Sequence, residues 1–145
     1  MKLFYLSLLS ILISGCATPM ALSLNKQDKP FTNFEAGKSQ VFFFRDCSFA
    51  GAARGVIVLK DKERIGGLNC GTYFVYQAVP GKYNFSAEDW LRKEEILTMD
   101  IVADKKYYIR ADLSFGLLDA DPYLETLSET EAKPIVNSLT YVLPQ

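Results

Sequence analysis

"TYFVYQAVPGKYNFSAE", residues 72–88, decides the fold class. Its first half is a run of aromatic and β-branched residues, whose bulky side chains fit the pleated surface of a sheet. Pro80-Gly81 then gives a strong turn signal, because Pro presets the first central φ and Gly accepts a positive one. From Tyr83 to Glu88 apolar and polar residues alternate, as in a half-buried strand. The stretch predicts two strands joined by a tight turn.

Similar signals repeat on both sides of this stretch. Strands are predicted at "SQVFFFRD" (39–46), at "GVIVLKD" (55–61), which turns through "KDKER" into "RIGGL", and near Tyr123–Leu127. "ILTMDIVADKKYYIRADL" (96–113) predicts a hairpin with Asp104-Lys105 near its turn. Turn signals about every eight to twelve residues, without helical crossovers, predict an all-β chain: a small antiparallel β-sandwich, Ig-like or transthyretin-like.

The sequence leaves open whether a short C-terminal helix forms. Ser128-Glu129-Thr130-Glu131 resembles a capping box, which favours a helix start at this point. Pro134 limits such a helix, because an interior proline loses a hydrogen bond and clashes with the preceding turn.

The first fifteen residues predict a signal peptide that ends at a lipidation site. Lys2 gives a positive start, and Leu3–Ile13 gives about eleven mainly apolar residues, too few to span a bilayer. Ile13-Ser14-Gly15-Cys16 resembles the lipobox of bacterial lipoproteins, in which the peptidase cuts before a Cys that carries diacylglycerol. The resemblance implies that Cys16 is the lipid site. An ordinary secretory signal with a coincidental Cys, or a buried amphipathic strand, is the alternative.

The chain is thus expected to comprise three segments: a signal peptide (1–15), a lipidated N-terminus and tether (16–38) and a β-sandwich domain (39–145). The tether has no clear period, and Phe31 and Phe34 predict that its second half lies against the domain. Ala17, where Asp would retain a lipoprotein in the inner membrane under enterobacteria-like sorting rules, favours the outer membrane, facing the periplasm. Two or three acyl chains hold a protein stably on a membrane.

Composition excludes several classes of function. Histidine is absent, which removes Ser-His-Asp and Cys-His catalysis and most zinc sites, so no metal or cofactor is expected. The net charge of −1 becomes about −2 once the first fifteen residues, with one lysine and no acidic residue, are removed. No basic stripe interleaved with aromatics is present, so nucleic acid is not an expected partner.

Three longer stretches carry a family resemblance: "GKSQVFFFRD" (37–46), "LKDKERIGGLNCGTYFVYQAVPGKYNFSAE" (59–88) and "KKYYIRADLSFG" (105–116). Together they resemble a family of uncharacterised bacterial lipoproteins that share domain of unknown function number 2846. The pattern is also similar to PEGA-type and carboxypeptidase-regulatory-like β-sandwiches. The resemblance implies a small, exported, lipid-anchored β-sandwich with no assigned reaction. The sequence departs from the family at Asp61-Lys62-Glu63, where Asp-Gly is common, so the type of that turn is open.

Cys47 and Cys70 predict a disulfide, since export places them in an oxidising compartment. Closing a loop of about 24 residues contributes ~3 kcal/mol in the chain-entropy model. Two separate buried thiols are the alternative. In both cases the role of Cys47 and Cys70 is structural.

Acidic pairs raise the question of carboxylate catalysis. They are Glu88-Asp89, Glu94-Glu95 and Asp119 with Asp121. Adjacent strand residues point to opposite faces, and the "DADP" loop lacks the length and distal Glu of a calcium loop, so solvated charge is the default. Arg45 and Arg110 are expected either to pair with a carboxylate such as Asp112 or to lie at a strand edge.

Aromatic residues are numerous enough to line a ligand groove, although most are expected in the core. The candidates are Tyr73, Phe74, Tyr76, Tyr83, Phe85, Trp90, Tyr107 and Tyr108. Trp90 lies in the charged connection "AEDWLRKEE" and is the predicted ligand contact.

The sequence thus predicts a lipid-anchored envelope lipoprotein, a non-enzymatic binding or accessory module for an envelope protein or glycan. A carboxylate-dependent glycan hydrolase and a purely structural envelope protein are the alternatives. Oligomeric state cannot be read from the sequence.

Overall fold

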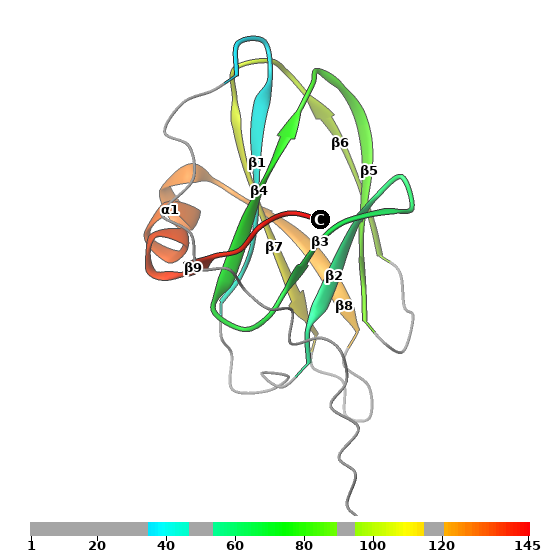
Figure 1. Cartoon of the computed structure of the whole chain (residues 1–145), viewed down its shortest axis with the longest axis vertical. Helices are drawn as coiled ribbons and strands as arrows, with labels where there is room; N and C mark the ends of the chain where they lie inside the picture. The colour runs from blue at the N-terminus through cyan, green and yellow to red at the C-terminus, as the bar shows by residue number, and fades with distance from the viewer. Residues whose placement is uncertain (1–34, 47–53, 90–94, 115–120) are drawn as a thin grey trace, which may run out of the picture.

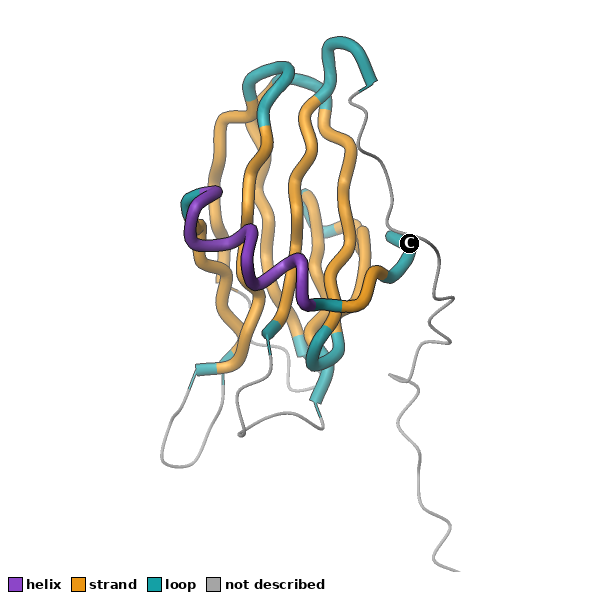
Figure 2. Tube along the Cα trace, turned by 90° about the vertical axis from the view of Figure 1, so that its left-hand side faces the viewer, coloured by secondary structure: helices purple, strands orange, loops and turns teal. Residues whose placement is uncertain are grey.

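A computed structural model gives the fold of the chain (Figure 1) and describes residues 35–46, 54–89, 95–114 and 121–145. Two sheets face each other, and one helix lies on the outside of the larger sheet (Figure 2). The elements are β1 (Ser39–Arg45), β2 (Val56–Lys60), β3 (Glu63–Leu68), β4 (Thr72–Ala78), β5 (Gly81–Glu88), β6 (Glu95–Ile101), β7 (Lys106–Leu113), β8 (Pro122–Leu127), α1 (Glu129–Ser138) and β9 (Thr140–Tyr141). The predicted β-sandwich is confirmed.

The five-stranded sheet has the order β8-β7-β1-β4-β9, and the four-stranded sheet has the order β3-β2-β5-β6. All pairings are antiparallel except β1 with β7 and β4 with β9, which are parallel. The predicted antiparallel pairing therefore holds for every strand pair except these two. The first places β1 at the centre of its sheet, between β4 and β7.

The predicted hairpin over residues 96–113 is wrong. β6 pairs with β5 in the four-stranded sheet, whereas β7 pairs with β1 and β8 in the other sheet. The connection is held at the start of β1: the Ser39 hydroxyl donates to the carbonyl of Val102 and accepts from the N–H of Lys105 at 3.0 Å. Asp104 has φ +58°, so the predicted turn exists, but it carries the chain from one sheet to the other. Pro80-Gly81 likewise joins strands of different sheets.

The predicted β2–β3 hairpin is confirmed, and its turn type is resolved. Asp61 and Lys62 have φ values of +48° and +72°, the pair of left-handed residues that a type I′ turn requires. The N–H of Asp61 donates to the carbonyl of Asn84 at 2.9 Å, which fastens the turn to β5.

The capping box at the start of α1 is also confirmed. The Ser128 side chain accepts from the N–H of Glu131, and the Glu131 carboxylate accepts from the N–H of Ser128 at 3.1 Å. Pro134 does not end the helix, contrary to the limit expected from it. The carbonyl that the proline leaves without a donor belongs to Thr130, which is exposed, so water can satisfy it. On the other face Ala132 and Val136 are buried over the five-stranded sheet (Figure 2).

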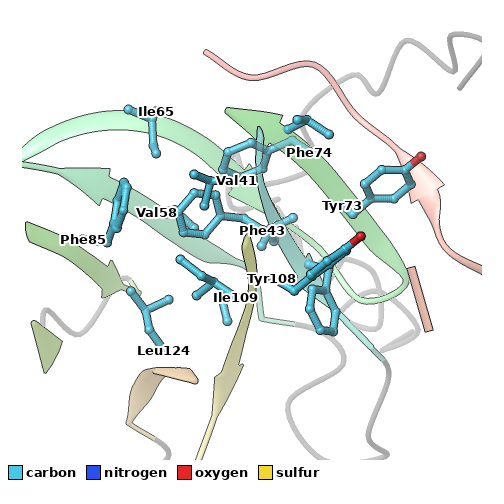
Figure 3. Close-up of a cluster of buried hydrophobic side chains, with 14 of the residues drawn as sticks. Val41, Phe43, Val58, Ile65, Tyr73, Phe74, Phe85, Tyr108, Ile109 and Leu124 are labelled. Carbon is cyan, nitrogen blue, oxygen red and sulfur yellow. The ribbon is translucent and has the colours of Figure 1, made fainter. Parts of the chain in front are cut away.

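The core fills the space between the two sheets, where its centre is aromatic (Figure 3), and it continues under α1 through Ala132 and Val136. Phe43 of β1 stacks on Phe74 of β4 at 5.2 Å between ring centroids and meets Phe85 of β5 edge-on at 5.1 Å. At Gly66 of β3 the sheets approach closely, because an added Cβ would lie 2.6 Å from the Phe74 ring. Most of the aromatic candidates are therefore core residues, as predicted.

Candidate functional site

Several residues predicted from the sequence as sites lie outside the described part of the chain. These are the lipidation site Cys16, the ligand-contact candidate Trp90, the disulfide candidate Cys47, and Glu94 and Asp119 of the acidic pairs. Cys70 is described and is bonded in a disulfide. Arg45 pairs with Thr72 in the register of β1 with β4, and each cysteine is two residues away from one member of this pair in the sequence. This register favours Cys47 as the partner of Cys70, and the pairing stays a prediction.

Arg45 pairs with Asp112, one of the two readings that the sequence left open. The Arg45 Nε lies 3.3 Å from Asp112 Oδ1, and the two side chains are 2% and 11% exposed. The same carboxylate oxygen accepts from the N–H of Leu113 at 2.9 Å, and the guanidinium also donates to the carbonyl of Arg54. Arg54 in turn pairs with the buried Asp89. Two ion pairs, joined through the backbone carbonyl of Arg54, thus connect β1 and β7 with the residues that flank β2 and β5.

Arg110 makes a second, more exposed set of ion pairs on the outer face of the five-stranded sheet. Its Nε lies 3.0 Å from Asp46 Oδ1, and its Nη2 donates to Asp46 Oδ2 at 3.1 Å, so the contact is bidentate. Its Nη1 lies 3.3 Å from Glu125 Oε2, and the guanidinium lies over the Phe44 ring at 5.9 Å. The predicted pairing of Arg110 is confirmed, with partners other than Asp112.

These pairs bear directly on the carboxylate hypothesis. Both buried carboxylates of the described residues, Asp89 and Asp112, have an arginine partner. Within those residues, no group of three or more Cys, Asp or Glu side chains could hold a metal ion. The geometry of the described charges is that of buried and half-buried ion pairs at the end of the sandwich.

A groove lies elsewhere, at the side of the sandwich where the edges of the two sheets meet. Its volume is about 340 Å³, and it is lined by Ile65, Val75, Tyr76, Gln77, Tyr141, Pro144 and Gln145. The C-terminal segment closes one end, because the N–H of Val142 donates to Tyr73 at 2.8 Å and the N–H of Gln145 donates to Ile65 at 2.9 Å. This volume falls in the range of small ligand pockets, about 300–1,000 Å³. Among the described residues, no acidic side chain lines the groove.

The wall formed by β4 is an open strand edge. β9 pairs only with Thr72 and Tyr73, and backbone groups alternate along a strand. Since the carbonyl of Tyr73 points toward β9, the N–H and C=O groups of Val75 and Gln77 point the same way, beyond the end of β9. In the described residues no strand pairs with β4 there. The Gln77 side-chain oxygen is buried and accepts no hydrogen bond from the described part of the chain.

Sequence reasoning did not predict this groove. Its walls come from β3, β4 and the last five residues, "YVLPQ", which are distant from one another in the sequence and carry no motif. The available signal was the run "FVYQA" (74–78), which has no charged residue although it lies on a strand that proves to be partly an edge.

Burial raises the pKa of five tyrosines above their usual value of about 10, because it disfavours the charged phenolate. A hydrogen bond with Glu129 adds to this effect on the pKa of Tyr108. The five tyrosines of raised pKa are Tyr73, Tyr76, Tyr108, Tyr123 and Tyr141. Two of them, Tyr76 and Tyr141, line the groove, where they present neutral phenols at neutral pH.

Comparison with known proteins places the chain in a family. A family model described as "Protein of unknown function (DUF2846)" matches residues 35–121. The chain belongs to the DUF2846 family. The resemblance seen in the sequence is thereby confirmed, whereas the likeness to PEGA-type domains stays a prediction. The matched range runs from before β1 to the residue before β8 and includes Ile65, Val75, Tyr76 and Gln77 of the groove.

A relative of this chain occurs in Haemophilus influenzae (strain ATCC 51907 / DSM 11121 / KW20 / Rd). It is described as an uncharacterized protein and is 29% identical over 132 residues, which cover 90% of this chain and 77% of the relative. No solved structure matches the chain. Within the described residues, no helix is long and apolar enough to cross a membrane.

Proposed function

We propose that this chain is a lipoprotein of the bacterial envelope, lipid-anchored at Cys16 in the outer membrane and facing the periplasm. Its β-sandwich is a non-enzymatic binding module for another envelope protein. The anchor is supported by the charge, apolar core and Ile13-Ser14-Gly15-Cys16 pattern of the first sixteen residues.

The observation that carries the binding function is the groove beside the open edge of β4. An extended peptide can add to such an edge through its backbone, while pockets along the edge select its side chains. The N–H and C=O groups of Val75 and Gln77 offer the backbone pairing. Ile65, Val75 and Tyr76 offer an apolar wall, and the Gln77 side-chain oxygen offers one further acceptor. The expected ligand is therefore an extended, largely apolar protein segment.

The glycan hydrolase is supported less well, because no acidic side chain of the described residues lines the groove and the buried carboxylates Asp89 and Asp112 each have an arginine partner. A hydrolase also needs two carboxyl groups facing one cleft.

The anchor is tested by mass spectrometry of the protein purified from membranes. The expected product begins at Cys16 and carries diacylglycerol, and a Cys16→Ala variant is expected to leave the membrane fraction. An unlipidated or uncleaved N-terminus in the wild-type protein would overturn the anchor.

The groove is tested by photo-crosslinking in intact cells. A photoreactive amino acid at position 145, which is exposed at the groove, is compared with one at Thr98, which is exposed on β6. The expected result is an adduct from position 145 that maps to one extended segment of one envelope protein. Gln77→Lys should abolish this adduct, and the matched Thr98→Lys should leave it unchanged. A synthetic peptide of the captured segment should then shift the NMR amide signals of Val75 and Gln77. Adducts that are equal at both positions, or insensitive to Gln77→Lys, would overturn the proposal.

A further inference from the structure

We infer that, when no partner is bound, the groove is occupied by the protein's own segment 20–25, so that the tether itself regulates access to the open edge of β4. This inference rests on the proposed function for the role of the groove. It names an occupant inside the same chain and makes the partner a competitor of the tether.

The position at which the described domain begins supports this occupant. Ser39, the first residue of β1, pairs with Ala78, the last residue of β4, so the chain enters the domain at the open end of the β4 edge. Positions 25 and 35 are ten residues apart, a distance of up to ~33 Å when the chain is extended. β4 has seven residues, about 24 Å at 3.4 Å per residue. The segment can therefore reach any part of the groove.

The sequence of the segment fits a strand with one apolar face. Although the tether has no single period along its length, Met20, Leu22 and Leu24 alternate with Ala21, Ser23 and Asn25. Such alternation is typical of a half-buried strand. Paired with β4, its backbone would satisfy the groups of Val75 and Gln77, and its apolar face would meet the apolar wall of the groove.

Occupancy by the tether has two physical consequences. A free tether of 18 residues (17–34) has a root-mean-square length of ~23 Å, whereas docking leaves about three free residues between Cys16 and the groove. The domain would then stay close to the membrane until a partner displaces the segment. Because a tethered segment has an effective concentration in the millimolar range, a partner must bind tightly enough to compete.

The test uses the soluble mature chain (residues 16–145, Cys16→Ser) and measures amide hydrogen exchange by NMR. We expect the amides of Val75 and Gln77 to exchange at least tenfold more slowly in this chain than in its Leu22→Asp/Leu24→Asp variant. A matched variant, Gln27→Asp/Asn33→Asp, adds the same charge outside the alternating run and should keep the slow exchange. Amides of β6, at the far edge of the other sheet, serve as the internal reference and should not change.

Equal exchange of Val75 and Gln77 in all three proteins would overturn the inference. The outcomes separate it from the proposed function. Slow exchange of Val75 and Gln77 without any captured partner segment would support docking of the tether and contradict the proposed partner. A mapped partner segment together with fast exchange would support the partner and contradict docking of the tether.

Discussion

Replacing Arg45 by methionine tests whether the buried charges at the end of the sandwich are structural. The Arg45 side chain is 2% exposed, and its Nε lies 3.3 Å from the Asp112 carboxylate, which is 11% exposed. Among the described residues, the N–H of Leu113 would be the one donor left to this carboxylate in the variant. Breaking a buried pair by removing one partner costs about 3–5 kcal/mol.

That loss is large against the total stability of a domain, which is about 5–15 kcal/mol. At about 4 °C per kcal/mol for a domain of this size, Arg45→Met should lower Tm by roughly 12–20 °C. The double variant Arg45→Met/Asp112→Leu removes both charges, so it should recover most of the lost stability. Urea unfolding of the wild type, the two single variants and the double variant gives the free energies for this cycle.

A loss below about 1 kcal/mol in Arg45→Met would refute the reasoning, because it would mean that solvent already compensates Asp112. A double variant no more stable than Arg45→Met would refute it as well. In that case the other contacts of the guanidinium, among them the one with the Arg54 carbonyl, would be the dominant contribution.

Four other perturbations have outcomes that the same structure predicts. Gly66→Ala should cost about 1–3 kcal/mol in urea unfolding, since its Cβ would lie 2.6 Å from the buried Phe74 ring; an unchanged midpoint would contradict the close approach of the sheets. Ser128→Ala should cost about 0.5–2 kcal/mol by removing the cap of α1, and Ser128→Asp should restore most of it. The five tyrosines of raised pKa should make the fold unstable in alkali, because they ionise near pH 10 in the unfolded chain but only at higher pH in the folded one. Their contribution to the free energy of unfolding is therefore full below pH 10 and is lost as the pH rises through the pKa values of the folded state. Absorbance at 295 nm against pH should therefore rise together with unfolding, and full ionisation of a folded chain near pH 10 would contradict this. Cys47→Ser should lower stability by about 3 kcal/mol, and peptide mapping that joins Cys70 to a cysteine other than Cys47 would contradict the predicted bridge.

Local features of the fold could be predicted from the sequence, whereas the partition of strands between sheets could not. The strands on either side of Pro80-Gly81, the β2–β3 hairpin and the Ser128 capping box depend on neighbouring residues, and all were predicted. The β6–β7 hairpin was wrong because a tight turn joins paired strands and crossing strands equally well. What distinguishes the two arrangements is the pairing of β6 with β5 and of β7 with β1, and β1 lies more than sixty residues away in the sequence, where Ser39 binds the connection.

The candidate sites divide in the same way. A buried arginine on a strand needs a carboxylate, so a partner such as Asp112 was one of the two readings for Arg45 that residue types allowed, and the structure decides for it. The groove could not, because it exists only where β9 ends after two residues and the chain then crosses to Ile65. The pattern of apolar residues along β4 does not show how many of its residues pair with a neighbouring strand such as β9.

The distribution of charged residues over the strand edges supports the proposal that another segment pairs with the open part of β4. Exposed sheet edges invite pairing with other chains, and proteins commonly place charges on them to prevent it. The three longer described edges follow this rule, with Glu63 and Arg64 on β3, Asp100 on β6 and Glu125 on β8, whereas the two-residue edge strand β9 carries no charge. Residues 74–78 of β4 carry no charge, although β9 covers only the start of that strand. An uncharged edge beside an apolar groove would promote aggregation if no other segment covered it. A segment of the tether or of a partner that pairs with this edge would prevent such aggregation. It would also explain why residues 74–78 carry no charge.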